Sequence, residues 1–219
     1  TTSPADIEVL EQISVTSQPA SKNVCQGASA SFEVLATGQV SGWQWQKNGV
    51  DIAGALSANY SISAVTIADT GLYRCVLTGP CGQVFSEAAE LRVDLMPVIS
   101  SQPAATIEIC EGNQMVLHTA AQGTNLSYQW YFNGNPVADN VNISGSTAPW
   151  LTVNGITQAD EGIYLCRVDN SCAAAITTGT QVWVNSPVTI ADQPDNTSAC
   201  IGDDISLAVV AAGDGFFPW

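Results

Sequence analysis

The stretch that decides the fold is DTGLYRC at residues 69–75, which returns as DEGIYLC at residues 160–166. In both copies an Asp-x-Gly turn precedes alternating residues, so the Tyr and the Cys lie on the same face of a strand. Upstream, WQKNG at residues 45–49 is answered in the same order by WYFNG at residues 130–134. The chain is therefore built from an internal repeat.

Shorter motifs extend the repeat in both directions. The tripeptide SQP at residues 17–19 recurs at 101–103 and, as DQP, at 192–194. A Cys-x-Gly motif follows each tripeptide, at Cys25, Cys110 and Cys200. These offsets predict the last strand of a preceding repeat at 1–11, complete repeats at 12–95 and 96–185, and the first strands of an incomplete repeat at 186–219.

Alternation with a period of two marks the strands within each repeat. Ala30, Phe32 and Val34 share one face of a strand whose other face is polar, and Trp43 and Trp45 point the same way on the next strand. Turn residues recur every eight to twelve positions. The pattern predicts an all-β fold of tandem sandwiches, each with about seven antiparallel strands in Greek-key order.

The order of these residues resembles an immunoglobulin domain. The matching residues are the core Trp of strand C, the corner Tyr and the strand-F Cys, at Trp45 and Trp130, Tyr73 and Tyr164, and Cys75 and Cys166. The short span 49–60 leaves no room for the extra strands of variable domains, so the likeness is to the intermediate or constant types. More narrowly, the Cys-x-Gly start resembles bacterial immunoglobulin-like repeats of large secreted or cell-surface proteins, often adhesins.

The chain departs from the antibody pattern at strand B. Where an antibody domain carries the partner cysteine, the alignment places Val34, Thr119 and, in the third copy, Val209. The usual bond between the two sheets therefore cannot form. Cys75 and Cys166 are expected to be buried thiols that behave as small hydrophobic side chains.

The resemblance also implies a pairing for the other cysteines. It places Cys25 and Cys110 where strand B begins and Cys81 and Cys172 in the F–G turn, at the opposite pole. Bridged Cα atoms lie only about 4.4–6.8 Å apart. We expect bonds between successive repeats, Cys25 with Cys172, and Cys81 and Cys110 with further neighbours. The alternative is a bond within one repeat, such as Cys25–Cys81, made by a different strand order.

Composition limits the function. Twenty acidic and five basic residues give a formal charge of −15, which disfavours nucleic acid and anionic lipid as partners. No run of eighteen apolar residues is present, so we expect no membrane insertion. Strand-rich composition with repeated cysteines is typical of extracellular proteins, secreted or held at the cell surface.

Candidate chemical groups are few. His118 alternates onto the outer face of its strand, and Asp69 and Asp160 open turns in which Asp caps backbone amides. No nucleophile lies beside a base, so we expect no enzyme activity, no cofactor and no resident metal. The acidic positions near the repeat boundaries, Asp94, Asp192 and Asp203–Asp204, are candidates for Ca²⁺ at domain junctions. They lack a ligand spacing, and a solvated acidic surface is the preferred interpretation.

One region differs between the repeats. The second copy is six residues longer between the Trp strand and the strand that begins near Trp150. Loops on a rigid sandwich often bind ligands. Trp150 with Asn140 and Asn142 would form a stacking surface for a sugar, with Asp139 as an acceptor. The interpretation we favour is that Trp150 covers the edge of a sheet.

Two functions fit these observations. The first is a non-catalytic extracellular structural or adhesive array, a segment of a bacterial surface adhesin, stalk or fibre. Its partners would be neighbouring repeats, other copies of itself, and a surface glycan or protein. The alternative is a glycan-binding module of a large secreted protein that carries an enzyme elsewhere. Residues shared by the repeats belong to cores and turns, which favours the array.

Overall fold

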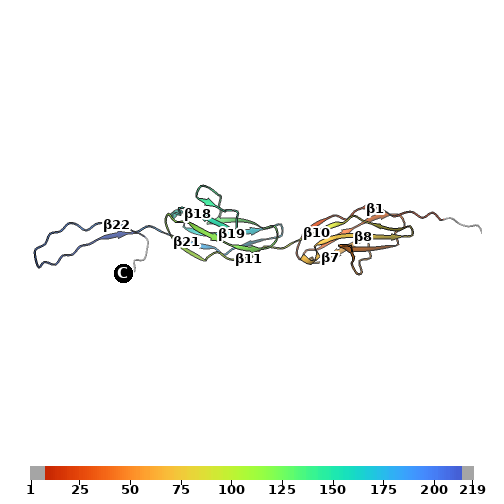
Figure 1. The fold of residues 1–219 in the computed structure, drawn as a ribbon, viewed down its shortest axis with the longest axis horizontal. Helices are drawn as coiled ribbons and strands as arrows, with labels where there is room; N and C mark the ends of the chain where they lie inside the picture. The colour runs from red at the N-terminus through yellow and green to blue at the C-terminus, as the bar shows by residue number, and fades with distance from the viewer. Residues whose placement is uncertain (1–7, 214–219) are drawn as a thin grey trace, which may run out of the picture. The chain divides into compact units, whose positions relative to one another are not determined.

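The computed structural model describes residues 8–213, and the chain divides into two compact units (Figure 1). The first contains the described residues up to Met96 together with two short loop segments, 123–125 and 171–173. The second contains 97–122, 126–170 and the described residues from Ala174 onward. Both units are all-β, as predicted.

The first repeat forms a sandwich of two main sheets. Its strands are β1 (Ser14–Ser17), β2 (Lys22–Cys25), β3 (Ala30–Glu33), β4 (Leu35–Thr37), β5 (Gly42–Lys47), β6 (Val50–Asp51), β7 (Asn59–Ile62), β8 (Gly71–Gly79), β9 (Gly82–Phe85) and β10 (Ala89–Asp94). One sheet has the order β2-β10-β8-β5-β6, with β9 also paired to β8. Opposite it, β3 pairs with β7, and β4 pairs with β1. A 3₁₀ turn, η1 (Ile67–Asp69), leads into β8.

The second repeat has the same plan with one strand more. Its strands are β11 (Val98–Ser101), β12 (Thr106–Cys110), β13 (Met115–His118), β14 (Ala120–Gln122), β15 (Ser127–Phe132), β16 (Asn135–Pro136), β17 (Ile143–Ser144), β18 (Trp150–Val153), β19 (Gly162–Asp169), β20 (Ala174–Ile176) and β21 (Thr180–Asn185). The sheet β12-β21-β19-β15-β16 faces the sheet β13-β18-β17. The added strand, β17, comes from the longer segment before Trp150. The 3₁₀ turn η2 (Gln158–Asp160) matches η1.

One pairing in each repeat departs from the expected antiparallel pattern. β2 runs parallel to β10, and β12 runs parallel to β21. The repeated SQP motif explains the departure, because proline has no N–H to donate and interrupts the first strand. The chain then crosses to the other sheet. The preceding glutamine secures the crossing: Gln18 Oε1 accepts a hydrogen bond from Glu87 N at 2.8 Å.

A tryptophan lies at the centre of each core. Trp45 and Trp130 are both 0% exposed. Each indole N–H still has an acceptor, Ser57 O for Trp45 and Ala148 O for Trp130, both at 2.9 Å. Burial of each tryptophan ring therefore stabilises the fold, and the indole N–H is not left without a hydrogen bond when it is removed from water. These are the positions that the strand pattern placed inside.

The third copy of the repeat begins with the same strand pair as the other two. β22 (Thr189–Asp192) pairs with β23 (Val210–Ala212), with an irregularity in register between Ile190 and Asp192. The pairs β1–β4 and β11–β14 have the corresponding irregularity. Residues 187–213 are all exposed, so the described part of this copy has no core.

The N-terminal strand expected at residues 1–11 is not observed within the described residues. Residues 8–11 have no strand structure, and residues 1–7 lie outside the described part of the chain. The last strand of an immunoglobulin sheet is held by its neighbours in that sheet, since its own residues make no local hydrogen bonds.

Candidate functional site

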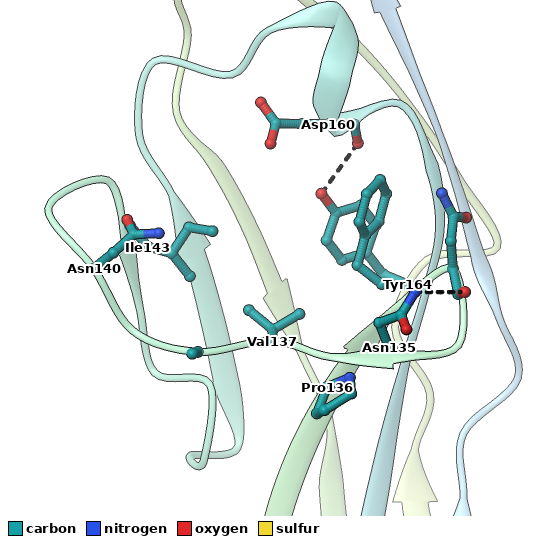
Figure 2. A pocket seen from close by; sticks show the side chains of 10 residues that line it. Asn135, Pro136, Val137, Asn140, Ile143, Asp160 and Tyr164 are labelled. Carbon is teal, nitrogen blue, oxygen red and sulfur yellow. Dashed lines mark hydrogen bonds between the residues drawn. The ribbon is translucent and has the colours of Figure 1, made fainter.

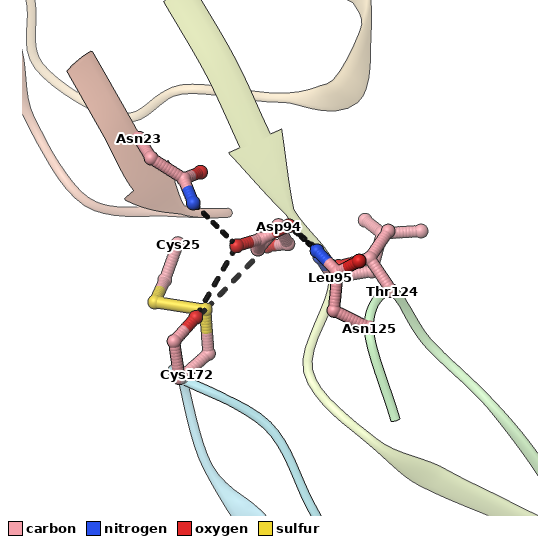
Figure 3. The surroundings of a disulfide bond; sticks show 8 residues. Asn23, Cys25, Asp94, Leu95, Thr124, Asn125 and Cys172 are labelled. Carbon is pink, nitrogen blue, oxygen red and sulfur yellow. Dashed lines mark hydrogen bonds between the residues drawn. A yellow bond between two sulfur atoms is a disulfide. The ribbon is translucent and has the colours of Figure 1, made fainter. Parts of the chain in front are cut away.

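A buried carboxylate organises one end of the first unit (Figure 3). Asp94, the last residue of β10, is only 6% exposed. Its Oδ2 accepts hydrogen bonds from Asn23 Nδ2 at 2.9 Å and Ser171 Oγ at 3.2 Å. Its Oδ1 accepts from Thr124 Oγ1 at 2.9 Å and Asn125 Nδ2 at 3.1 Å. Four neutral donors thus satisfy both oxygens.

These donors fix the ionisation of Asp94. The hydrogen bond from Thr124, followed by that from Asn23, lowers the pKa of the Asp94 carboxyl below its ordinary value, against the opposing effect of desolvation. The carboxylate is therefore charged at neutral pH and stabilises the loop segments that donate to it. With both oxygens engaged, Asp94 is a structural anchor and is poorly suited to act as a base.

A disulfide lies beside this carboxylate. Cys25, at the end of β2, is bonded to Cys172, 147 residues away in sequence, with a Cα–Cα distance of 5.5 Å. The backbone also closes around the cluster, because Gln26 N donates to Asp94 O at 2.9 Å. The structure thus contains the bond expected between sequence repeats, and the alternative Cys25–Cys81 bond is not formed.

The five other cysteines are free and fall into two classes. Cys75 and Cys166 are 0% exposed, and burial raises the pKa of each thiol to about 11. Cys81, Cys110 and Cys200 are exposed. The buried thiols pack as apolar side chains. The exposed thiols are accessible to solvent and to other thiols.

The strand-B positions explain why the buried thiols have no bond. Val34 and Thr119 are both 0% exposed in the interiors that contain Cys75 and Cys166. Thr119 Oγ1 is satisfied by donating to Ser101 O at 2.8 Å. Each interior is held mainly by apolar packing, and in the second one the buried Thr180 Oγ1 has no hydrogen-bond partner among the described residues.

Each E–F turn uses its aspartate as a cap. Asp69 Oδ2 accepts from Thr66 N at 2.7 Å and Thr66 Oγ1 at 2.8 Å, and these bonds lower the pKa of the carboxyl. Asp160 Oδ2 makes the same pair of bonds with Thr157, both at 2.8 Å. The corner tyrosine then donates its O–H to the aspartate carbonyl, from Tyr73 at 2.7 Å in the first repeat. This accounts for both aspartates without catalysis.

The second repeat contains a hollow between β16 and β17 (Figure 2). Its volume is ≈ 450 Å³. It is lined by Phe132, Asn133, Asn135, Pro136, Val137, Ala138, Asn140, Ile143, Asp160 and Tyr164. Asn140 and Ile143 contribute to its lining from the longer segment, and the rings of Phe132 and Tyr164 have centroids 4.7 Å apart.

The sugar-surface residues predicted from the sequence do not gather in this hollow. Asn140 lines it, and Asn142 lines a smaller adjoining hollow. Asp139 Oδ1 accepts from Ser146 N at 2.7 Å, and hydrogen bonds from Ser146 lower the pKa of this carboxyl. Trp150 is 52% exposed at the start of β18 and lines neither hollow. Its strand partner is His118, which is exposed, as expected.

The hollow itself was not found from the sequence. The signal lay in the two features that create it: the six-residue insertion, and Phe132 standing two positions after the core Trp.

Among residues 8–213, no three His, Cys, Asp or Glu side chains are grouped as metal ligands. The boundary residue Asp94 is bonded to amides and hydroxyls, while Asp203 Oδ2 accepts from Cys200 N at 2.9 Å.

With this geometry known, comparison with other proteins is informative. Residues 96–170 match the family described as immunoglobulin domain. Contactin-6 of Rattus norvegicus is 27% identical over 141 residues, covering 58% of this chain and 14% of the relative. The muscle M-line assembly protein unc-89 of Caenorhabditis elegans is 32% identical over 134 residues, covering 58% and 2%. The human cell adhesion molecule DSCAM is 25% identical over 187 residues, covering 78% and 9%. The chain thus spans a small part of these relatives.

Solved structures give the same fold. The I-band fragment I67–I69 of titin aligns with a TM-score of 0.77 at 19% identity, covering 94% of this chain and 77% of the other. Extracellular domains 3–5 of Drosophila OTK align with a TM-score of 0.60 at 24% identity, covering 84% and 65%. The chain therefore consists of tandem immunoglobulin-like β-sandwiches. The named relatives are animal proteins, so the narrower bacterial resemblance receives no support from them.

Within 8–213, no helix has the length and apolar character needed to cross a bilayer.

Proposed function

We propose that this tandem of immunoglobulin-like domains is a non-catalytic, extracellular segment of an adhesion-type protein, in which disulfides link successive repeats. The observation that carries the proposal is the Cys25–Cys172 bond beside Asp94. Disulfides form and persist mainly in oxidising compartments, which favours a location outside the cytosol. The likeness to a cell adhesion molecule over 78% of the chain supports the same role.

The repeat pattern extends this bond beyond the two complete sandwiches. Cys110 ends β12 as Cys25 ends β2, and Cys81 lies in the turn that corresponds to the one holding Cys172. Both are exposed and free. We expect each to pair with the matching cysteine of another repeat, either along a longer chain or in another copy.

Adhesion can be tested directly. Beads coated with the chain should aggregate with one another, and soluble chain should reduce the aggregation by competition. Beads coated with a single repeat are the control for non-specific sticking. Negative-stain electron microscopy of the unreduced protein would distinguish polymers from separate particles. Beads that stay dispersed, together with separate particles, would leave a spacer role and contradict self-adhesion.

The linking bond has its own test. Peptide mapping without reduction should yield a fragment joining Cys25 to Cys172. Thiol labelling of the monomeric chain, in which no further repeat is present to pair with them, should modify the three exposed cysteines first, Cys81, Cys110 and Cys200. A fragment joining Cys25 to Cys81 would contradict this part of the proposal.

A further inference from the structure

We propose that the hollow between β16 and β17 binds a lysine side chain of a partner protein. The first repeat contains the frame of this site with its own lysine in place. Lys47 lies two residues after Trp45 and pairs across the sheet with Tyr73. In the second repeat Phe132 occupies that position and pairs with Tyr164.

The first repeat demonstrates how the frame holds an ammonium group. Lys47 Nζ lies 5.9 Å from the centroid of the Tyr73 ring and donates a hydrogen bond to Ala68 O. Hydrogen bonds from Thr66 lower the pKa of Asp69, and the charge of Lys47 lowers it further. The ammonium is thus held by an aromatic face and a carbonyl, and its charge acts on the Asp69 carboxylate without a direct ion pair.

The second repeat keeps this frame and lacks the cation. Thr157, Ala159, Asp160 and Tyr164 stand where the first repeat has Thr66, Ala68, Asp69 and Tyr73. The described residues form two ion pairs, Arg92–Glu90 and Arg167–Asp169, so neither Asp69 nor Asp160 is in a direct ion pair; the two repeats differ in that Phe132 stands where the first repeat has Lys47. The span 96–185 contains no lysine, and its single arginine, Arg167, is already paired.

The shape of the hollow suits the missing side chain. Phe132, Pro136, Val137 and Ile143 supply apolar walls for a four-carbon stem, and Figure 2 shows the Asp160 carboxylate at one end. A lysine buries its stem along apolar surface and keeps its ammonium at a polar end. The volume, ≈ 450 Å³, is within the usual range for binding sites and also leaves room for the backbone that carries the lysine.

The rim favours a peptide as the carrier of that lysine. Asn140 Oδ1 accepts hydrogen bonds from Asn142 N at 2.8 Å and Ile143 N at 2.9 Å. Its amide orientation is therefore fixed, and its NH₂ group is the donor left at the rim, suited to a peptide carbonyl. The net charge of −15 also attracts a basic partner.

The experiment titrates the whole, ¹⁵N-labelled chain with Nα-acetyl-lysine methylamide and follows its amide resonances. The norleucine analogue, which keeps the stem and lacks the ammonium, is the matched probe. We expect saturable shifts at residues 137–143 and at Asp160 with the lysine probe. The norleucine analogue should bind with an affinity at least about fivefold lower. Equal binding of both probes would make the hollow a site for an apolar side chain and overturn the proposal.

Three variants sharpen the test. Asp160→Asn should weaken binding of the lysine probe about fivefold, while Asp69→Asn, the same change in the first repeat, should leave it unchanged. Phe132→Lys supplies the lysine from the chain itself and should abolish binding while keeping the Asp160 cap. Shifts spread over the acidic surface, or binding retained in Phe132→Lys, would contradict a specific site. If Asp160→Asn fails to fold, Phe132→Lys decides the outcome.

Discussion

Cysteine has two different roles in this chain: in the sandwich interiors it is a buried free thiol, and beside Asp94 it forms a disulfide. We call Asp94 with its donors Asn23, Thr124, Asn125 and Ser171 the Asp94 cluster. Cys75 and Cys166 lie in sandwich interiors and form no bond, whereas Cys25 and Cys172 are bonded beside a hydrogen-bonded carboxylate. Apolar packing around a tryptophan is sufficient for each interior. The bond instead fixes a loop tip that has little apolar surface to hold it. Stability of the sandwiches and attachment of the loop are therefore separable properties.

The largest expected effect comes from the interior. Trp130→Ala removes a side chain that is 0% exposed and should destabilise the second repeat by about 3–5 kcal/mol. Urea unfolding followed by circular dichroism measures the loss. Trp150→Ala is the matched control, because that ring is 52% exposed, and it should cost about 0.5 kcal/mol or less. Similar losses in the two variants would contradict packing as the basis of stability.

Removing the disulfide should have a smaller effect. Cys25→Ser is expected to cost about 2 kcal/mol, the low end of the usual range, because both interiors stay intact. Amide hydrogen exchange should accelerate most at residues 171–173 and around Asp94, where the loop is attached. A loss as large as that of Trp130→Ala would mean that the bond supports the interiors after all.

Acid should loosen the same cluster by protonating Asp94. Its pKa is lowered in the folded state, so its contribution is complete above the ordinary value of 3.8 and is lost as pH falls below that value toward the folded pKa. Asp94→Asn should reduce the slope of melting temperature against pH between about 2 and 4. The lowered pKa of Asp69 persists in this variant and supplies the internal reference. An unchanged slope would contradict the role assigned to Asp94.

The smallest effect is expected at the buried thiols. Cys75→Val replaces one small apolar side chain by another and should change stability by less than about 1.5 kcal/mol, in either direction. Cys166→Val tests the second interior in the same way. Chemical unfolding under reducing conditions gives both values. A loss well above this range would show that the thiol makes a specific interaction.

The core was predictable because its signals are local. Trp45 and Tyr73 stand at fixed distances from turn residues, and alternation assigns each side chain to a face. The parallel β2–β10 pair was not predicted, since alternation gives the face of a residue and not the direction of its neighbouring strand. The proline of the SQP motif interrupts the first strand, and this interruption is the sequence feature from which the crossing to the other sheet could have been predicted.

The candidate site was harder to predict because it depends on a comparison of two copies. Sequence reasoning grouped Trp150 with Asn140 because they are close in sequence. In the structure Ile143 pairs with Val153, at the other end of the strand that Trp150 begins. The informative difference is that position 132 holds Phe where the first repeat holds Lys47, and its meaning depends on the contacts that Lys47 makes in the structure.

The donors around Asp94 have a consequence for whether the two repeats are interchangeable. Three of the four side chains that donate to Asp94 come from the second repeat, Thr124, Asn125 and Ser171, and the matching positions of the first repeat hold Gln39, Val40 and Pro80. Position 185, which corresponds to Asp94, holds a neutral asparagine. The two copies therefore differ at the positions that hold Asp94, and replacing the second repeat by a copy of the first would remove these three donors.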